Sequence, residues 1–350
     1  RTFVGCTAIL FGTACMGAVK YVPENMKVEL SLKVPGNNAV NYKLHPDKLE
    51  NSYFDYEWRS DNKLPITVFH KVEERDSCMR LTVQLTAAQD VYFNYRQLLS
   101  TGYRHDNCQF YMPGFWYRRN LRSPKKAPSF HTSDSWLVRE DRLSAPLTGI
   151  FSEKEKRFMT VNRLDDFSMD ALATHKEGEI ILSGKTSLGF TGFENQQGIA
   201  MLSFGFPYRE APKSYIRKLT LAPEVEAFQL MKKGESVLLT WEIMESGADD
   251  FSDFIQHTWE HCYDTYAPKP VENSYSIADM KQVLSCFFVN SLVDNQPLVY
   301  NSGIHLKVSD CERNGQAEVG FIGRVLLNAF NAWEYGWQSN REELKVNSTK

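Results

Sequence analysis

The chain has 350 residues, 42% of them apolar, so it is long enough for two domains with a hydrophobic core in each. Its 40 basic residues are balanced by 43 acidic ones, for a net charge of −3, which excludes a general nucleic-acid-binding protein. Aromatic residues make up 13%, a share that fits both a sandwich core and a carbohydrate site.

Residues 1–18 have the pattern of a secretory signal remnant. A basic residue, Arg1, is followed by an apolar run around Ile9 and then by small residues from Gly12. Lipid attachment at Cys15 is an alternative, although Gly12 stands where a leucine is usual. The apolar run is too short to span a bilayer. We therefore expect an exported protein, periplasmic or at the cell surface.

The cysteines give no metal or disulfide pattern. The seven lack CxxC pairs and regular spacing, so we predict buried free thiols. His257 and His261 are four apart, a spacing that can chelate a metal, but no third ligand is in sight. We predict no metal and no cofactor.

Residues 19–245 have the pattern of a large antiparallel β-sandwich. Apolar and polar residues alternate with period two in short runs, and Asn37-Asn38 and Asp61-Asn62 provide turns between them. About a dozen strands imply two packed sheets. The predicted strands include 28–34, 66–72, 80–85, 91–95, 158–161, 179–182, 199–206, 215–221 and 236–241.

The densest chemistry of the chain lies between Met112 and Pro146, which we interpret as a long loop. Aromatic rings can stack on the CH faces of a sugar, polar groups can pair with its hydroxyls, and arginine forks can hold an acidic substituent. The alternative is that the rings pack on the sheet and the arginines pair with Asp134, Glu140 and Asp141. The predicted substrate-binding residues here are Trp116, Tyr117, Arg119, Trp136, Arg139, Asp141 and Arg142.

After Ser246 the pattern becomes helical. Apolar residues from 251 to 266 form one stripe, Asp249 or Asp250 complements the N-terminal dipole, and Pro268 stops the helix. We interpret 246–272 as a linker helix that leads to a second domain at 273–350.

The second domain begins with two predicted helices. Ser276 and Asp279 have the spacing of a capping box, and the apolar stripe after them runs to Leu292. Another helix is predicted over 317–335, with Gly336 at its C-cap. Two such helices cannot bury their stripes alone, so we expect this domain to continue beyond Lys350.

The connection between these helices, 294–316, is unusually long for a helical array. It is the second predicted site segment, and His305 in it is a predicted substrate-binding residue. Tyr300 and Arg313 also lie in it.

Taken together, the chain resembles the secreted glycosidase-like proteins of gut-type Bacteroidetes, which join an N-terminal β-sandwich to a six-hairpin (α/α)6 barrel. The resemblance rests on this architecture and on three stretches, Gly114-Phe-Trp-Tyr-Arg, Trp136 to Arg142 and Glu318-Val-Gly-Phe-Ile-Gly-Arg. It implies an enzyme that acts on a plant or host polysaccharide, with acid and base in the barrel and a sandwich loop at the cleft.

Glycoside hydrolysis needs two carboxyl groups, and Asp310 and Glu312 are the predicted pair because they lie on the inter-helix loop. Their alternative role is to cap a helix or to pair with Arg313. A polysaccharide lyase, which Tyr300, His305 and Arg313 would serve, is a second hypothesis. A glycan-binding surface protein without activity is a third, and a structural protein whose aromatic loop joins two domains is a fourth.

Overall fold

The computed structural model describes residues 22–349, except 76–77, 125, 166–176, 218, 270–271, 273–274, 291, 294–298, 301–303, 307–310 and 314–323. Three predictions therefore lie wholly or partly outside the described residues: the signal remnant with Cys15, the position of Asp310, and the start of the helix predicted over 317–335, with most of the stretch from Glu318 to Arg324. The chain divides into two compact units, Arg1–Tyr266 and Ala267–Lys350, which are described separately below.

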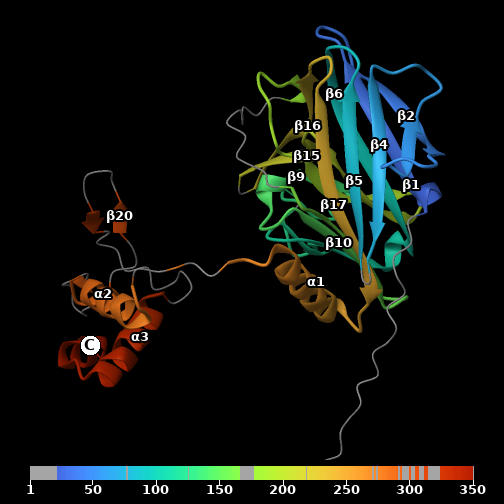
Figure 1. The fold of residues 1–350 in the computed structure, drawn as a ribbon. Helices are drawn as coiled ribbons and strands as arrows, with labels where there is room; N and C mark the ends of the chain where they lie inside the picture. Colours follow the sequence, from blue (N-terminus) through green and yellow to red (C-terminus); the bar gives the residue numbers. More distant parts are fainter. Residues whose placement is uncertain are drawn as a thin grey trace, which may run out of the picture. The chain divides into compact units, whose positions relative to one another are not determined.

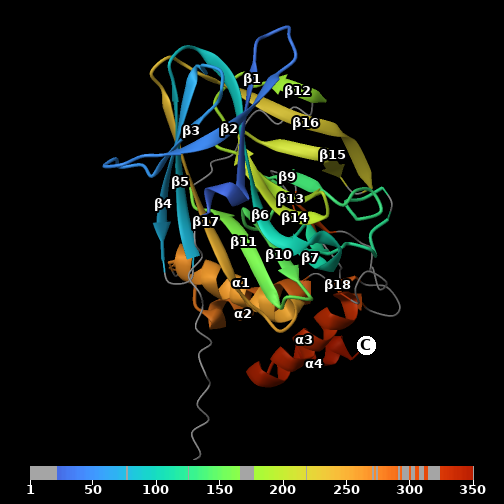
Figure 2. The same ribbon diagram turned by 90° about the vertical axis from the view of Figure 1, so that its right-hand side faces the viewer.

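The first unit is built from two sets of paired strands (Figures 1 and 2). In the first set, neighbouring strands pair in the order β1, β6, β14, β13 and β9, all antiparallel. Strand β16 pairs with β6, β15 pairs with both β16 and β9, and β12 pairs with β16 in parallel. The bounds in this set are β1 Met26–Lys33, β6 Val91–Arg104, β9 Trp136–Arg139, β12 Gly178–Ile181, β13 Phe190–Gln196, β14 Ile199–Phe206, β15 Arg209–Arg217 and β16 Thr220–Met231.

The second set pairs in the order β3, β4, β5, β17, β11, β10, β7 and β8, again antiparallel. Strand β2 pairs with both β1 and β3 and so joins the two sets. The bounds are β2 Val40–Lys48, β3 Tyr56–Arg59, β4 Ile66–Glu74, β5 Cys78–Ala87, β7 Cys108–Met112, β8 Trp116–Arg118, β10 Leu147–Ser152, β11 Arg157–Arg163 and β17 Ser236–Gly247.

The core lies between these two sets. Rings from opposite sets meet there: Phe204 of β14 lies 5.2 Å from Trp241 of β17, and Phe110 of β7 lies 4.0 Å from Phe193 of β13, measured between ring centroids. Along β5, buried and half-buried residues alternate, as expected for a strand with one face in a core. The large two-sheet sandwich is thus formed as the alternation predicts, with one parallel pair in it.

Two local predictions are wrong. The run 215–221 is not one strand, because β15 ends at Arg217 and β16 begins at Thr220, with Leu219 at a φ of 59° between them. The segment from Met112 to Pro146 is not one long loop, because it contains β8, β9 and a 3-10 turn, η3 (Glu140–Arg142). Two other short 3-10 turns are η1 (Pro23–Asn25) and η2 (His105–Asn107).

Helix α1 (Phe251–Tyr266) belongs to the first unit and packs on it (Figure 1). The carboxylate of Asp250 accepts hydrogen bonds from the backbone N–H groups of Ser252 and Asp253 at 2.7 and 3.0 Å, so this aspartate begins the helix as predicted. Phe254 is fully buried, and its ring lies 4.9 Å from that of Phe158 on β11. The boundary between the two units falls directly after Tyr266, where this helix ends.

The described part of the second unit contains helices α2 (Ile277–Asn290), α3 (Arg324–Ser339) and α4 (Glu342–Ser348). The capping box of α2 is confirmed: the backbone N–H of Ser276 donates to the Asp279 carboxylate at 3.0 Å, and that of Asp279 donates to the Ser276 hydroxyl at 3.1 Å. Two small hairpins, β18 (Leu292–Val293) with β19 (Val299–Tyr300) and β20 (Ile304–Leu306) with β21 (Cys311–Arg313), lie between α2 and α3.

The predicted C-cap at Gly336 is wrong, because α3 continues to Ser339. A Cβ atom at Gly336 would lie 3.0 Å from the Cβ of Leu344, so the glycine instead allows α4 to approach α3 closely. The chain is therefore mostly β followed by helices. Within the described residues, no helix has the length and apolarity that a membrane crossing requires.

Candidate functional site

The two tryptophans of the segment from Met112 to Pro146 lie inside the core. Trp116 and Trp136 are both 0% exposed, and their ring centroids are 5.8 Å apart. Each indole N–H donates to a backbone carbonyl, that of Arg118 at 3.0 Å and that of Ser133 at 3.1 Å. Because their faces are covered by protein, these two rings hold the segment on the sandwich and offer no stacking surface.

Around these buried rings the segment forms one side of a large pocket of about 780 Å³. The side chain of Tyr117 is 51% exposed there, and Arg118 and Arg122 are exposed as well. The residues that line this pocket are Gln109, Tyr117, Arg118, Arg119, Asn120, Leu121, Arg122, Ser123 and Glu153; we call it the arginine pocket.

Two arginines of the arginine pocket are held in place by their neighbours. The guanidinium of Arg119 donates from Nε to the backbone carbonyl of Cys108 at 3.2 Å and lies 5.1 Å from the ring centre of Phe130. That of Arg118 lies 4.9 Å from the ring centre of Phe251, the first residue of α1. The Nη2 group of Arg119 also donates to the backbone carbonyls of His105 and Asp106, which leaves its Nη1 group for a ligand. The cation–π contact of Arg118 restricts its side chain while its N–H donors stay available.

The backbone of this pocket has an uncommon conformation. Arg118 and Asn120 have φ angles of 58° and 48°, the left-handed region that asparagine tolerates better than other residues with side chains. The Asn120 side chain accepts a hydrogen bond from the N–H of Tyr117 at 3.0 Å and so stabilises the turn. Backbone strain of this kind is concentrated at functional sites.

A smaller pocket of about 380 Å³ lies on another part of the segment. Arg139 forms a bidentate pair with Asp141, at 3.0 and 2.8 Å, and Arg142 forms one with the buried Glu210. Each guanidinium is thus matched by one carboxylate. The lining residues are Gly114, Phe115, Arg139, Asp141, Arg142, Tyr215 and Ile216; we call it the paired-charge pocket.

Glu140, between these two arginines in sequence, points into the protein. It is 0% exposed, accepts from the Arg163 guanidinium at 2.7 Å and from the Gly189 N–H at 2.8 Å. Burial raises the pKa of Glu140, and the charge of Arg163 opposes this rise. This buried pair fixes η3 and hence the positions of Asp141 and Arg142 at the surface.

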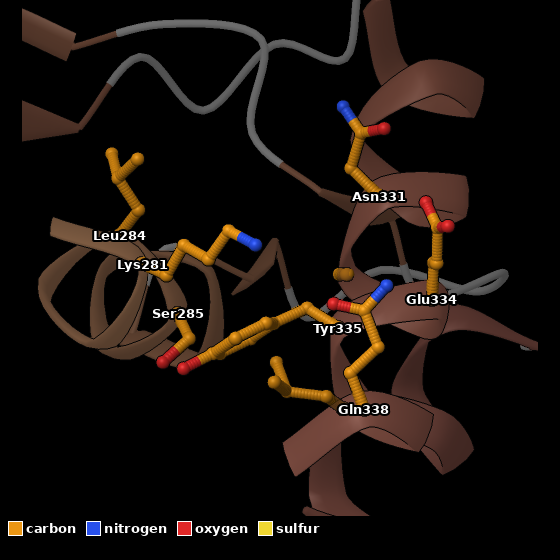
Figure 3. A pocket seen from close by; sticks show the side chains of 9 residues that line it. Lys281, Leu284, Ser285, Asn331, Glu334, Tyr335 and Gln338 are labelled. Carbon is orange, nitrogen blue, oxygen red and sulfur yellow. The ribbon is translucent and has the colours of Figure 1, made fainter. Parts of the chain in front are cut away.

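The second unit holds the other predicted site residues and a further pocket. The hairpin register places His305 opposite Glu312, while Asp310 lies outside the described residues. A pocket of about 460 Å³ opens between α2, α3 and α4; in Figure 3 the Tyr335 side chain reaches from α3 toward Ser285 on α2. Glu334 is the carboxylate in its lining, a residue that no sequence pattern singled out.

A group that the sequence did not indicate lies in the first unit: the side-chain ligand atoms of Cys78, Glu242 and His261 are within 4.8 Å of one another. The predicted buried thiols are confirmed for Cys78, Cys108 and Cys262, whereas Cys286 is exposed. The spacing of His257 and His261 was the only signal for this group, because its other members are remote in sequence.

No protein-family model and no curated protein matches this sequence. Solved structures that match include a polysaccharide lyase, 13% identical over 67% of this chain and 27% of its own, with a TM-score of 0.31. An α-galactosidase from Geobacillus stearothermophilus, solved with stachyose, is 10% identical over 63% of this chain and 30% of its own, with a TM-score of 0.27. A protein from Synechocystis is 7% identical over 62% of this chain and 73% of its own, with a TM-score of 0.33. The chain thus spans less than a third of the lyase and of the galactosidase.

Proposed function

We propose that the chain is a carbohydrate-active protein that binds an acidic oligosaccharide or polysaccharide in the arginine pocket. One observation carries the proposal: three arginines and an exposed tyrosine ring line a single pocket that contains one carboxylate, Glu153. Three guanidinium groups against this one carboxylate leave the lining with an excess of positive charge.

The chemistry of the lining fits such a ligand. The exposed face of Tyr117 offers a stacking surface for the CH groups of a sugar ring, and Ser123 offers a hydroxyl that can pair with those of the sugar. Guanidinium forks bind a uronate carboxylate or a sulfate with two parallel hydrogen bonds. The pocket volume of about 780 Å³ lies within the usual range for small-molecule sites, roughly 300–1,000 Å³.

The paired-charge pocket is a weaker candidate for an acidic ligand. Arg139 already pairs with Asp141, and Arg142 with Glu210. A carboxylate of the ligand would therefore have to compete with a carboxylate of the protein at each guanidinium group. Substitutions in the two pockets therefore give a direct comparison.

The binding test is a glycan array of acidic and neutral polysaccharides, followed by variants. We expect Tyr117→Ala and Arg122→Gln each to lower the affinity for an acidic glycan at least about tenfold. The first removes a stacking surface and the second a charge-assisted contact. Tyr215→Ala, in the paired-charge pocket, is the matched control and should leave the affinity unchanged. The opposite pattern would place the ligand in the paired-charge pocket and overturn the assignment.

We further propose that the activity is glycoside hydrolysis, that the helices of the second unit begin an (α/α)6 barrel, and that the protein acts outside the cytoplasm. In this proposal Asp310 and Glu312 supply the acid and the base, and His305, opposite Glu312 in the hairpin register, contacts substrate.

The test of hydrolysis is the release of reducing ends from the polysaccharides that bind. We expect Asp310→Asn or Glu312→Gln to lower turnover by about 100-fold or more while binding at the arginine pocket persists. Unsaturated uronate products would instead show a lyase. Binding without turnover in a protein that contains both units would contradict the hydrolase proposal and leave a glycan-binding protein.

A further inference from the structure

A thiol, a carboxylate and an imidazole from three elements meet on the outer face of the sandwich under α1. Cys78 begins β5, Glu242 lies in β17 and His261 lies in α1. In the register of β5 and β17, Cys78 is opposite Met244 and Arg80 is opposite Glu242. Cys78 and Glu242 are therefore diagonal neighbours on one face of the sheet.

The three side chains are close and largely shielded from water. The Nε2 atom of His261 is 2.7 Å from Oε1 of Glu242, and the Sγ, carboxylate and imidazole atoms all lie within 4.8 Å of one another. Cys78 is 4% exposed and Glu242 is 3% exposed. The side chain of His261 is 22% exposed, so the group can be reached from solvent on the helix side.

We propose that Cys78, Glu242 and His261 form a binding site for a zinc-type divalent cation, with water as the fourth ligand. Sulfur, nitrogen and carboxylate oxygen are the ligand atoms that Zn²⁺ takes in proteins, and three protein ligands with one open position are a common set. In a tetrahedral zinc site the ligand atoms lie about 3.3–3.7 Å apart, so small side-chain rotations would suffice to close the group around the ion.

The surroundings fit a bound cation in charge and in orientation. When Zn²⁺ binds, the Cys78 thiol releases its proton to solvent, and the thiolate and the carboxylate together balance the two positive charges. The Thr265 hydroxyl donates to Oε1 of Glu242 at 3.0 Å, and a guanidinium nitrogen of Arg80 lies 3.6 Å from Oε2. Such outer contacts orient the carboxylate of a metal site.

This inference is independent of the proposed glycan binding. Its consequence is that the cation ties α1 to the two strands beneath it, in addition to the packing of Phe254. The ion would therefore stabilise the folded first unit by mass action.

The experiment is a titration of chelator-treated, reduced protein with Zn²⁺ by calorimetry, and with Co²⁺ by absorption. We expect one equivalent of Zn²⁺ to bind and to raise the melting temperature, and Co²⁺ to give the charge-transfer absorption of a cobalt–thiolate bond. Cys78→Ser should remove that absorption, and Glu242→Gln and His261→Gln should each weaken Zn²⁺ binding at least about tenfold.

The controls are Cys108→Ser, a buried thiol on another strand, and His257→Gln, one helical turn before His261. Both should bind Zn²⁺ as the unsubstituted protein does. The proposal is overturned if the unsubstituted protein shows no cobalt–thiolate absorption, a result that does not depend on how well any variant folds. Zinc binding that is unaffected by Cys78→Ser would overturn it as well.

Discussion

Trp116 and Tyr117 are sequence neighbours with opposite surroundings. The first is fully buried and the second is 51% exposed, because successive residues of strand β8 face opposite sides. From the sequence, both rings were predicted to bind a sugar, because an aromatic residue suits a sugar site as well as it suits a hydrophobic core. Which of the two rings faces the core depends on the pairing of β8 with β7. That pairing cannot be predicted from the residue types alone.

This difference gives a paired prediction. Trp116→Ala should lower the free energy of unfolding by about 3–5 kcal/mol, the usual cost of removing a large buried ring. Tyr117→Ala should cost about 1 kcal/mol or less and instead lower the affinity for acidic glycan. Denaturant unfolding and glycan titration of both variants check this. Equal losses of stability would contradict the structural assignment of the two rings.

His70 makes the stability of the first unit depend on pH. It is 0% exposed and its ring nitrogen Nε2 is 2.7 Å from the Tyr95 hydroxyl. Burial lowers the pKa of His70 from 6.5 to about 3. Below about pH 6.5, His70 is protonated in the unfolded chain but stays neutral in the folded chain. The free energy of unfolding therefore falls as the pH drops from 6.5 toward 3.

The expected effect is about 1.4 kcal/mol per pH unit in this window. Denaturant unfolding of the unsubstituted protein and of His70→Gln at pH 7 and pH 5 would measure it. Their difference in stability should shrink by about 2 kcal/mol at the lower pH. The same substitution at the exposed His45 is the control, and a difference that does not change with pH would refute the effect.

At the scale of elements, the packing of α1 on the sheet depends on Gly149 of β10, which has no side chain and so leaves room for the Phe254 ring. A Cβ atom there would lie 2.5 Å from Cζ of Phe254, closer than real atoms approach. The ring of Phe254 also stacks on that of Phe151, with 6.0 Å between centroids. The helix pattern and its Asp250 cap were readable from sequence, but the sheet face that receives the helix was not.

We therefore predict that Gly149→Ala lowers the free energy of unfolding by about 1–3 kcal/mol, the cost of overpacking a core. Phe254→Ala should cost about 3–5 kcal/mol. Because the smaller side chain at 254 makes room for the added methyl group, the double variant should lose less than the sum of the two. Simple additivity would show that α1 does not rest on Gly149. Tyr263→Ala, at a position 66% exposed on the same helix, is the control.

At the scale of the whole molecule, the order of β structure followed by helices could be predicted from the change of period after Ser246. The contacts that form the sites could not. Cys78 and Glu242 are far apart in sequence and become neighbours only through the register of β5 and β17. Likewise, Arg142 forms its ion pair with Glu210 and not with a carboxylate of its own segment, because the fold brings η3 and β15 together.

The central claim is that the excess positive charge of the arginine pocket selects an acidic glycan. Its most direct measurement is a titration of the protein with an acidic and a neutral oligosaccharide of equal length, at low and at high salt. We predict that the acidic ligand binds at least about tenfold more tightly at low salt, and that salt and Arg122→Gln each reduce this preference. Equal affinity for the two ligands, or a preference that neither salt nor Arg122→Gln changes, would contradict the claim.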